Sequence, residues 1–309
     1  MKAISYSRYG GPEVLEYGEL PEPKVGPDGV LIQVRAASVN PVDWKCQAGY
    51  LDGLMDAVFP VVPGWDVSGV VVRLGLCVPE FAVGDEVMGY VREDFLSRGT
   101  FAEYVAAPVR TLARKPRTFG FEEAAALPLV GLTAYQALHR ALAVRPGDTV
   151  LVHAAAGGVG SVAVQIARHL GCRVIGAARD AGQERVAELG AEPVRFDEET
   201  FTDQVRALAP QGVDAVLDTI GGPFLKLSAR LLAPRGRLAS IADGEVLALG
   251  GTYFWTRPDA ADLAALADLA DAGVLTVRVA RSFPLEQAAE AQRANAAGGL
   301  NGKVVVTVP

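Results

Sequence analysis

The chain has 309 residues, of which 50% are hydrophobic and 21% are charged, a balance typical of a globular protein long enough to bury a sizeable core. Its formal net charge of −7 and its lack of basic runs argue against a nucleic-acid-binding surface. No apolar stretch predicts a membrane span, Met1 to Ile4 lead straight into strand-like sequence rather than a signal peptide, and three widely spaced cysteines fit the reducing cytoplasm.

Residues 1 to 118 are predicted to be rich in β-strands. Short apolar runs at 30–34, 67–74 and 86–88 are separated by proline, glycine and aspartate, which favour turns. One further strand is expected at 99–105. Many short strands joined by such turns are typical of a small barrel or a sandwich.

Beyond residue 118 the pattern changes to alternating helices and strands. Helical segments are expected at 122–127 and 132–142. From Thr149 onward, apolar strands are expected to end near Ala178, Phe196, Leu217 and Ser240, with helices near 160–170, 182–189, 200–209 and 223–232. This alternation predicts an α/β protein with a doubly wound parallel sheet. Helices at 259–272 and 285–297 and a strand within 302–308 are expected to follow.

The segment 149–171, TVLVHAAAGGVGSVAVQIARHLG, predicts a nucleotide-binding strand, turn and helix. A β-branched apolar run is followed by small residues and then by apolar residues at helical spacing. The turn departs from the G-x-G-x-x-G pattern, because Ala155 stands at its first position and Gly157 and Gly160 at the other two. Glycines let the backbone approach a pyrophosphate, and the helix N-terminus offers free N–H groups. The predicted pyrophosphate contacts are Ala156, Gly157, Gly158 and Val159.

The next predicted strand ends at Ala178, where a bound dinucleotide presents its ribose. An NAD site usually carries an acidic residue there, whereas an arginine accommodates a 2′-phosphate. Arg179 holds this position and favours NADP(H) over NAD(H). Alternatively, Arg179 is an exposed loop residue that the neighbouring Asp180 neutralises.

Other cofactor contacts are expected at the carboxyl ends of later strands, because ligands of open α/β sheets bind at that edge. The expected residues are Thr219, Ile220, Gly221, Ile241 and Ala242.

Phrases spread along the whole chain carry a resemblance to one family. They are NPVD at 40–43, VPGWDVSGV at 62–70, GDEV at 84–87, GTFAEY at 99–104, AALP at 125–128, GLTAY at 131–135, VLDTIGG at 216–222 and Gly302-Lys303. In this order and spacing, the chain resembles the zinc-independent quinone oxidoreductase (zeta-crystallin-like) branch of the medium-chain dehydrogenase/reductase superfamily.

The resemblance implies a fold and an assembly. It implies a GroES-like β-rich domain made of residues 1–118 and 275–309, and a Rossmann NADP(H)-binding domain made of residues 119–274. The cofactor is expected in the cleft between these domains. A homodimer is expected from the resemblance alone.

No metal is expected. Zinc alcohol dehydrogenases of the superfamily use cysteine and histidine ligands in the N-terminal domain, but here Trp65 stands where the histidine would be and the segment around Asn40 lacks the cysteine. Cys46 has no partner at ligand spacing. A catalytic zinc site usually needs three protein ligands.

The resemblance also implies roles for residues of the first domain. Asn40 is expected near the nicotinamide, with a turn residue before a proline as the alternative. Asp43 is expected to hold its loop by hydrogen bonds rather than to transfer protons. Tyr50 follows Gly49, and related 2-enoyl-thioester reductases carry a tyrosine just after a similar glycine, which they use to donate or orient a proton. The spacing in this chain is one residue shorter than in some relatives. The alternative role of Tyr50 is packing in the substrate pocket.

Three further residues are expected at the cofactor. Thr133 lies in a phrase that approaches the nicotinamide in the family. Phe254 is expected to cover the cofactor or to form a subunit contact. Lys303 is expected to reach the cofactor or to be a solvated lysine.

Without a Lewis acid, reduction of an already polarised acceptor is easier than oxidation of an unactivated alcohol. The sequence therefore predicts a cytoplasmic, NADPH-dependent reductase that transfers hydride to a small quinone or α,β-unsaturated carbonyl compound. An enoyl-thioester reductase of a fatty-acid or polyketide pathway is the alternative enzyme. A non-catalytic, crystallin-like NADPH-binding protein is the alternative of another class.

Overall fold

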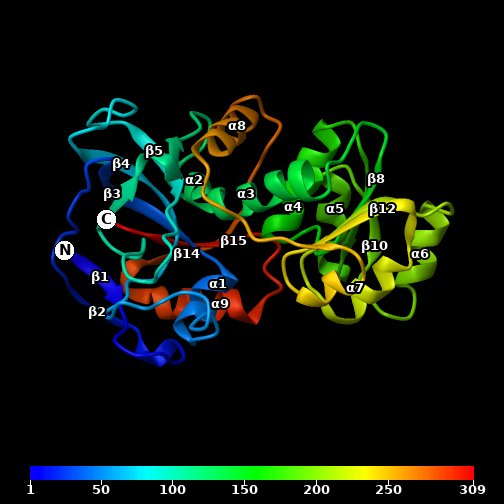
Figure 1. Cartoon of the computed structure of the whole chain (residues 1–309), viewed down its shortest axis with the longest axis horizontal. Helices are drawn as coiled ribbons and strands as arrows, with labels where there is room; N and C mark the ends of the chain where they lie inside the picture. The colour runs from blue at the N-terminus through cyan, green and yellow to red at the C-terminus, as the bar shows by residue number, and fades with distance from the viewer. The chain divides into compact units, whose positions relative to one another are not determined.

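The computed structural model describes all 309 residues, which form two compact units (Figure 1). The first unit contains Met1–Leu129, Pro258–Asp271 and Val277–Pro309, and the second contains Val130–Arg257 and Ala272–Thr276. By contact, the helices at Phe121–Ala126 (α2) and Ala260–Asp271 (α8) belong to the first unit, because α2 packs on β3 and α8 on β7. The sequence-based division, which assigns 119–274 to the second domain, stays a prediction.

The first unit is built on a mainly antiparallel sheet with the strand order β14-β15-β3-β4-β5-β7, in which β6 also pairs with β3. Its strands are β1 (Lys2–Ser5), β2 (Glu16–Glu19), β3 (Gly29–Val39), β4 (Asp66–Leu74), β5 (Glu86–Tyr90), β6 (Tyr104–Pro108), β7 (Leu112–Arg114), β14 (Val279–Pro284) and β15 (Lys303–Thr307). The other helices are η1 (Pro12–Val14), α1 (Pro41–Gln47), η2 (Val109–Thr111), η6 (Leu285–Gln287) and α9 (Ala288–Ala297).

The long strand β3 is the centre of the first unit's core. It is paired on one side with β15 and on the other with β4, and it is antiparallel to both. Apolar residues of these strands, among them Val34, Val67 and Val306, pack in one buried cluster. The strand expected at 99–105 begins only at Tyr104, because the residues before it form hydrogen bonds with other segments: Thr100 and Phe101 donate their N–H groups to the carbonyl oxygens of Gly64 and Pro63, each at 3.0 Å.

The second unit is a parallel six-stranded sheet with the order β10-β9-β8-β11-β12-β13. Its strands are β8 (Thr149–Val152), β9 (Arg173–Ala178), β10 (Glu192–Arg195), β11 (Val213–Asp218), β12 (Leu232–Ser240) and β13 (Thr252–Tyr253). Because the strand order reverses at β8, the carboxyl ends of β8 and β11 form the edge where a ligand is expected.

Helices of the second unit lie close to the positions expected from the sequence. They are α3 (Pro128–Gln136), which leads into the unit, η3 (Ala137–Ala141), α4 (Gly158–His169), η4 (Asp180–Gly182), α5 (Gln183–Glu188), α6 (Phe201–Leu208), α7 (Gly222–Ala229) and η5 (Gly244–Leu247). The helix expected over 132–142 is an α-helix that ends in a π-helical turn, η3. No helix is long and apolar enough to span a membrane.

Candidate active site

The turn between β8 and α4 is shaped for close backbone packing. Ala154 adopts φ 45°, a left-handed conformation that is strained for alanine, and its carbonyl oxygen accepts the N–H of Gly157 at 2.8 Å. A Cβ at Gly160 would lie 2.2 Å from the same oxygen, so α4 can approach the turn this closely only with glycine there. The first N–H groups of α4 have no intrahelical acceptor and fit a pyrophosphate.

Arg179 follows β9 and is exposed, with no ion pair in the structure. The neighbouring Asp180 pairs instead with Arg195, at 3.0 Å between Nε and Oδ1. This pairing follows from the sheet, since the register of β10 on β9 sets Arg195 beside Ala178. Asp180 therefore does not neutralise Arg179, and the guanidinium remains available to a 2′-phosphate.

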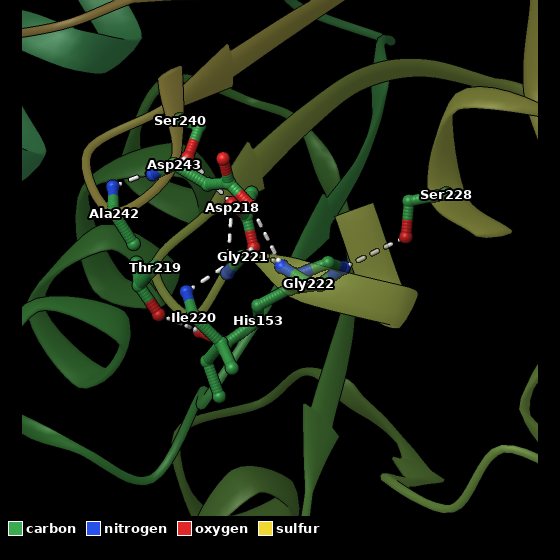
Figure 2. A network of polar contacts seen from close by, with 10 residues as sticks. All are labelled: His153, Asp218, Thr219, Ile220, Gly221, Gly222, Ser228, Ser240, Ala242 and Asp243. Carbon is green, nitrogen blue, oxygen red and sulfur yellow. Dashed lines mark hydrogen bonds and ion pairs between the residues drawn. The ribbon is translucent and has the colours of Figure 1, made fainter. Parts of the chain in front are cut away.

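A buried carboxylate, Asp218, holds the carboxyl ends of β8 and β11 together (Figure 2). His153 Nδ1 lies 2.7 Å from Asp218 Oδ1, and His153 Nε2 lies 2.8 Å from Ser228 Oγ. Burial raises the pKa of Asp218, but its hydrogen bond and electrostatic interaction with His153 outweigh this and hold the pKa below its usual value. An ionised carboxylate can only accept, so Nδ1 of His153 carries the hydrogen.

The same carboxylate fixes the loop that follows β11. The N–H groups of Ile220 and Gly221 donate to Asp218 Oδ1 at 3.1 and 2.9 Å. The hydroxyl of Thr219 donates to the carbonyl oxygen of His153 at 3.0 Å. Of the three loop residues expected at the cofactor, Ile220 and Gly221 are therefore held by Asp218, for which the sequence predicts no role, and Thr219 is held by the backbone of His153.

Ser240, at the end of β12, joins the loop 241–243 to this network (Figure 2). Its hydroxyl donates to Asp218 Oδ2 at 2.5 Å and accepts the N–H groups of Ala242 and Asp243. Asp243 in turn accepts the N–H of Gly222 at 2.9 Å. The ends of β8, β11 and β12 are thus connected in one set of hydrogen bonds.

Phe254 and Thr133 are two more residues of the second unit that are expected at the cofactor. The N–H of Phe254 donates to the carbonyl oxygen of Ser240 at 2.8 Å, so Phe254 continues from β13 next to the end of β12. Thr133 is buried, and its hydroxyl lies 2.8 Å from that of Thr256. The role of each at a cofactor stays a prediction.

In the first unit, Asn40 lies in a buried polar cluster. Its Nδ2 donates to Asp66 Oδ2 at 2.8 Å, and its Oδ1 accepts from Lys303 Nζ. Lys303, at the start of β15, also donates to the carbonyl oxygen of Val39 at 3.1 Å and is only 5% exposed. Lys303 is therefore a buried, paired lysine rather than a solvated one, and its contact with a cofactor stays a prediction.

Asp43 belongs to the same cluster. It stands three residues after Asn40, the N-cap of α1, and its Oδ2 accepts the N–H of Asn40 at 2.7 Å. This confirms that Asp43 holds the loop by a hydrogen bond. Burial raises the pKa of Asp43 to about 7, although the hydrogen bond from Asn40 acts in the opposite direction.

A small cavity of about 20 Å³ opens beside Asp43. Its wall includes Asp43, Cys46, Trp65, Phe95 and Leu96. Trp65 packs edge-on against Tyr90, with ring centroids 6.0 Å apart. Burial raises the pKa of Cys46 to about 12, so this thiol is a poor metal ligand.

Tyr50 lies in the turn after α1 and is 72% exposed, without a side-chain partner. Its proton-donating role and its alternative role in packing of the substrate pocket both stay predictions. No three histidine, cysteine, aspartate or glutamate side chains are grouped so as to hold a metal ion. The absence of a metal from the enzyme stays a prediction as well.

A β-rich unit and a parallel doubly wound sheet with a glycine turn define a two-domain dehydrogenase fold, and comparison with known proteins agrees. The family model for the alcohol dehydrogenase GroES-like domain matches residues 26–117, and that for zinc-binding dehydrogenase matches residues 189–306. These matches confirm the expected GroES-like and Rossmann architecture.

Three known proteins illustrate the similarity. The chain is 30% identical to human quinone oxidoreductase over 99% of this chain and 97% of that protein. It is 36% identical to an NADPH-dependent alkenal/one oxidoreductase of Arabidopsis thaliana, over 80% of this chain and 67% of that protein. A solved structure described as an NAD-dependent alcohol dehydrogenase is 34% identical and superposes with a TM-score of 0.90, covering 100% of both chains. The chain belongs to the quinone oxidoreductase branch of the medium-chain dehydrogenase/reductase superfamily.

Proposed function

We propose that this chain is an NADPH-dependent reductase that transfers hydride, without a metal ion, to a quinone or an α,β-unsaturated carbonyl compound. The observation that carries the proposal is the nucleotide site of the second unit, where the packed glycine turn is followed at the end of β9 by an unpaired Arg179. The names of the human and Arabidopsis relatives support the acceptor class.

The residues of the second unit fit the cofactor. The N-terminus of α4, with Gly157 and Gly158, would hold the pyrophosphate, and Arg179 would bind the 2′-phosphate. The hydrogen-bonded loops 219–222 and 241–243 offer a rigid edge for the rest of the molecule. Bound NADPH would supply a hydride from its nicotinamide ring.

We place the enzyme in the cytoplasm as a homodimer. All three cysteines are free, which suits a reducing compartment. The edge strand β13 carries the exposed Tyr253, and the exposed Trp255 follows it, a surface that fits a subunit contact.

The test combines cofactor titration and turnover. The purified protein is titrated with NADPH and with NADH by fluorescence, metal content is measured on the same sample, and reduction of 1,4-naphthoquinone and 2-cyclohexenone is then followed. Tighter NADPH binding, turnover and no stoichiometric zinc are expected. NADH preference would return Arg179 to a surface role, and tight NADPH binding without any turnover would favour the crystallin-like alternative.

A further inference from the structure

Two side chains with opposite cofactor preferences follow one another after β9. Arg179 suits a 2′-phosphate, whereas the carboxylate of Asp180 suits the ribose hydroxyls of NADH, because an acidic residue about 20 residues beyond the glycine turn accepts their hydrogens. Both residues are exposed. Arg179 alone therefore does not set the preference, which also depends on where the carboxylate of Asp180 is held.

The carboxylate of Asp180 is held by Arg195, the last residue of β10. Arg195 Nε lies 3.0 Å from Asp180 Oδ1, and Arg195 Nη2 donates to Asp180 Oδ2 at 3.2 Å. One guanidinium thus occupies both carboxylate oxygens, and this two-point geometry fixes the orientation of the carboxylate while it neutralises its charge.

Contacts of the backbone fix the position of Arg195 beside the end of β9. β10 pairs with β9 in a register that sets Arg195 opposite Ala178, and the N–H of Arg195 donates to Gln204 Oε1 of α6 at 2.8 Å. Gln183 Nε2 donates to the carbonyl oxygens of both Ala178 and Val194 and so ties the two strand ends together. The guanidinium therefore extends from a fixed backbone.

The same two strands carry a second ion pair of this kind at their opposite ends. Arg173, at the start of β9, donates to both carboxylate oxygens of Glu192, at the start of β10, at 2.6 Å from Nε and 2.8 Å from Nη2. Exposed ion pairs of either kind contribute little to stability. The two pairs differ in location, because only the pair of Arg195 and Asp180 lies at the carboxyl ends of the strands, where open α/β sheets bind their ligands.

We propose that Arg195 is a specificity-determining residue that favours NADPH by sequestering the carboxylate of Asp180. This inference rests on the proposed function. Held by Arg195, the carboxylate neither accepts the ribose hydroxyls of NADH nor repels the 2′-phosphate of NADPH, which Arg179 binds. Arg195 acts through Asp180 and is therefore a positioning residue.

The experiment measures the Kd of NADPH and of NADH by fluorescence titration of the full chain. In Arg195→Ala the freed carboxylate repels the 2′-phosphate and accepts the ribose hydroxyls. NADPH binding should therefore weaken, NADH binding should strengthen, and the ratio of the two Kd values should move by about 10-fold toward NADH. Adding Asp180→Asn to Arg195→Ala should restore the preference for NADPH, because the carboxylate is gone.

Arg173→Ala is the matched control, since it removes an ion pair between the opposite ends of the same strands and should leave both Kd values unchanged. Asp180→Asn alone is an independent measurement that keeps Arg195 in place. It should not weaken NADH binding, because the carboxylate of the wild type is already engaged. The titrations of the wild type and of Asp180→Asn give an answer even if Arg195→Ala does not fold.

Each outcome decides between the two proposals. The role of Arg195 would be overturned, with the proposed function left intact, by an unchanged ratio in Arg195→Ala, by an equal shift in Arg173→Ala, by a double variant that still binds NADPH weakly, or by a loss of NADH binding in Asp180→Asn. A wild type that binds neither cofactor, or that prefers NADH, would overturn the proposed cofactor site, and the role of Arg195 with it.

Discussion

Arg179 and Arg195 stand at the ends of neighbouring strands, yet only one of them is free to bind an anion. Arg195 is engaged by Asp180 at 3.0 Å and by Asp197 at 3.7 Å. Arg179 has no such partner and follows β9, where we propose that the ribose of a dinucleotide is recognised. Both arginines are exposed, so exposure does not show which of them can bind an anion. The ion pairs of Arg195 with Asp180 and Asp197 do show it, because Arg179 has none.

Replacing Arg179 with alanine should therefore affect one cofactor and not the other. We expect Arg179→Ala to weaken NADPH binding by about 1–3 kcal/mol, the scale of a charge-assisted hydrogen bond, and to leave NADH binding nearly unchanged. Fluorescence titration measures both affinities. Arg206→Ala, an exposed arginine on α6, is the control. Equal losses for the two cofactors would remove the 2′-phosphate assignment.

At this scale, residues with local signals could be predicted. Arg179 follows a recognisable strand, and Asp43 follows Asn40 by the three residues of a capping box. The burial of Asp43 Oδ1 without a hydrogen-bond partner could not be predicted. It occurs in a cluster with Asp66 and Lys303, which come from distant parts of the chain. Asp218 was missed although it gave a signal, an acidic residue that ends a buried strand before two glycines.

A single residue, Gly160, sets how closely helix α4 packs against the turn that follows β8. Helix α4 buries Val162, Ile166 and other apolar residues and begins beside the carbonyl oxygen of Ala154. The first turn of α4 can pack this closely against Ala154 only while residue 160 has no side chain.

We expect Gly160→Ala to displace α4, because its Cβ would lie 2.2 Å from Ala154 O. The free energy of unfolding should fall by about 1–3 kcal/mol, as in other overpacked sites, and NADPH affinity should fall with it. Thermal unfolding and fluorescence titration give the two values. Gly18→Ala on β2 meets no atom within 4 Å and serves as the control. A variant with wild-type stability and affinity would show that the turn tolerates a side chain.

Elements with a strong period were predicted well, and elements that depend on tertiary contacts were not. Helix α4 and strand β8 follow directly from the apolar pattern of their residues. The strand expected at 99–105 is displaced to Tyr104–Pro108, because pairing with β3 rather than local pattern sets its start. The π-helical turn at Ala137–Ala141 has no signal in the helical period.

The stability of the whole molecule should respond to pH in opposite directions in its two units. The native pKa of Asp218 is lowered, so its contribution is present above the pKa of the unfolded chain, about 4, and is lost as the pH falls. The native pKa of Asp43 is raised to about 7, so its contribution is present in acid and is lost as the pH rises toward 7.

Asp218→Asn tests the first of these effects. At pH 7 we expect the variant to be about 3–5 kcal/mol less stable, because a buried carboxylate that accepts four donors is lost. The difference from the wild type should shrink below about pH 4, where the wild type loses the same interaction. Chemical denaturation at both pH values measures it. An equal difference at both values would contradict the assignment of an ionised Asp218.

The place of β15 in the first unit has a consequence for how the protein is made. β15 lies between β14 and β3, and Lys303 at its start supplies the cation of the buried cluster. A ribosome releases the residues of the second unit earlier, so that unit can fold while Ala36 to Val39 of β3 still lack β15 as a neighbour. The part of the protein that is synthesised first is therefore finished last, and a chain that stalls before residue 303 leaves the edge of β3 at these buried residues open to aggregation.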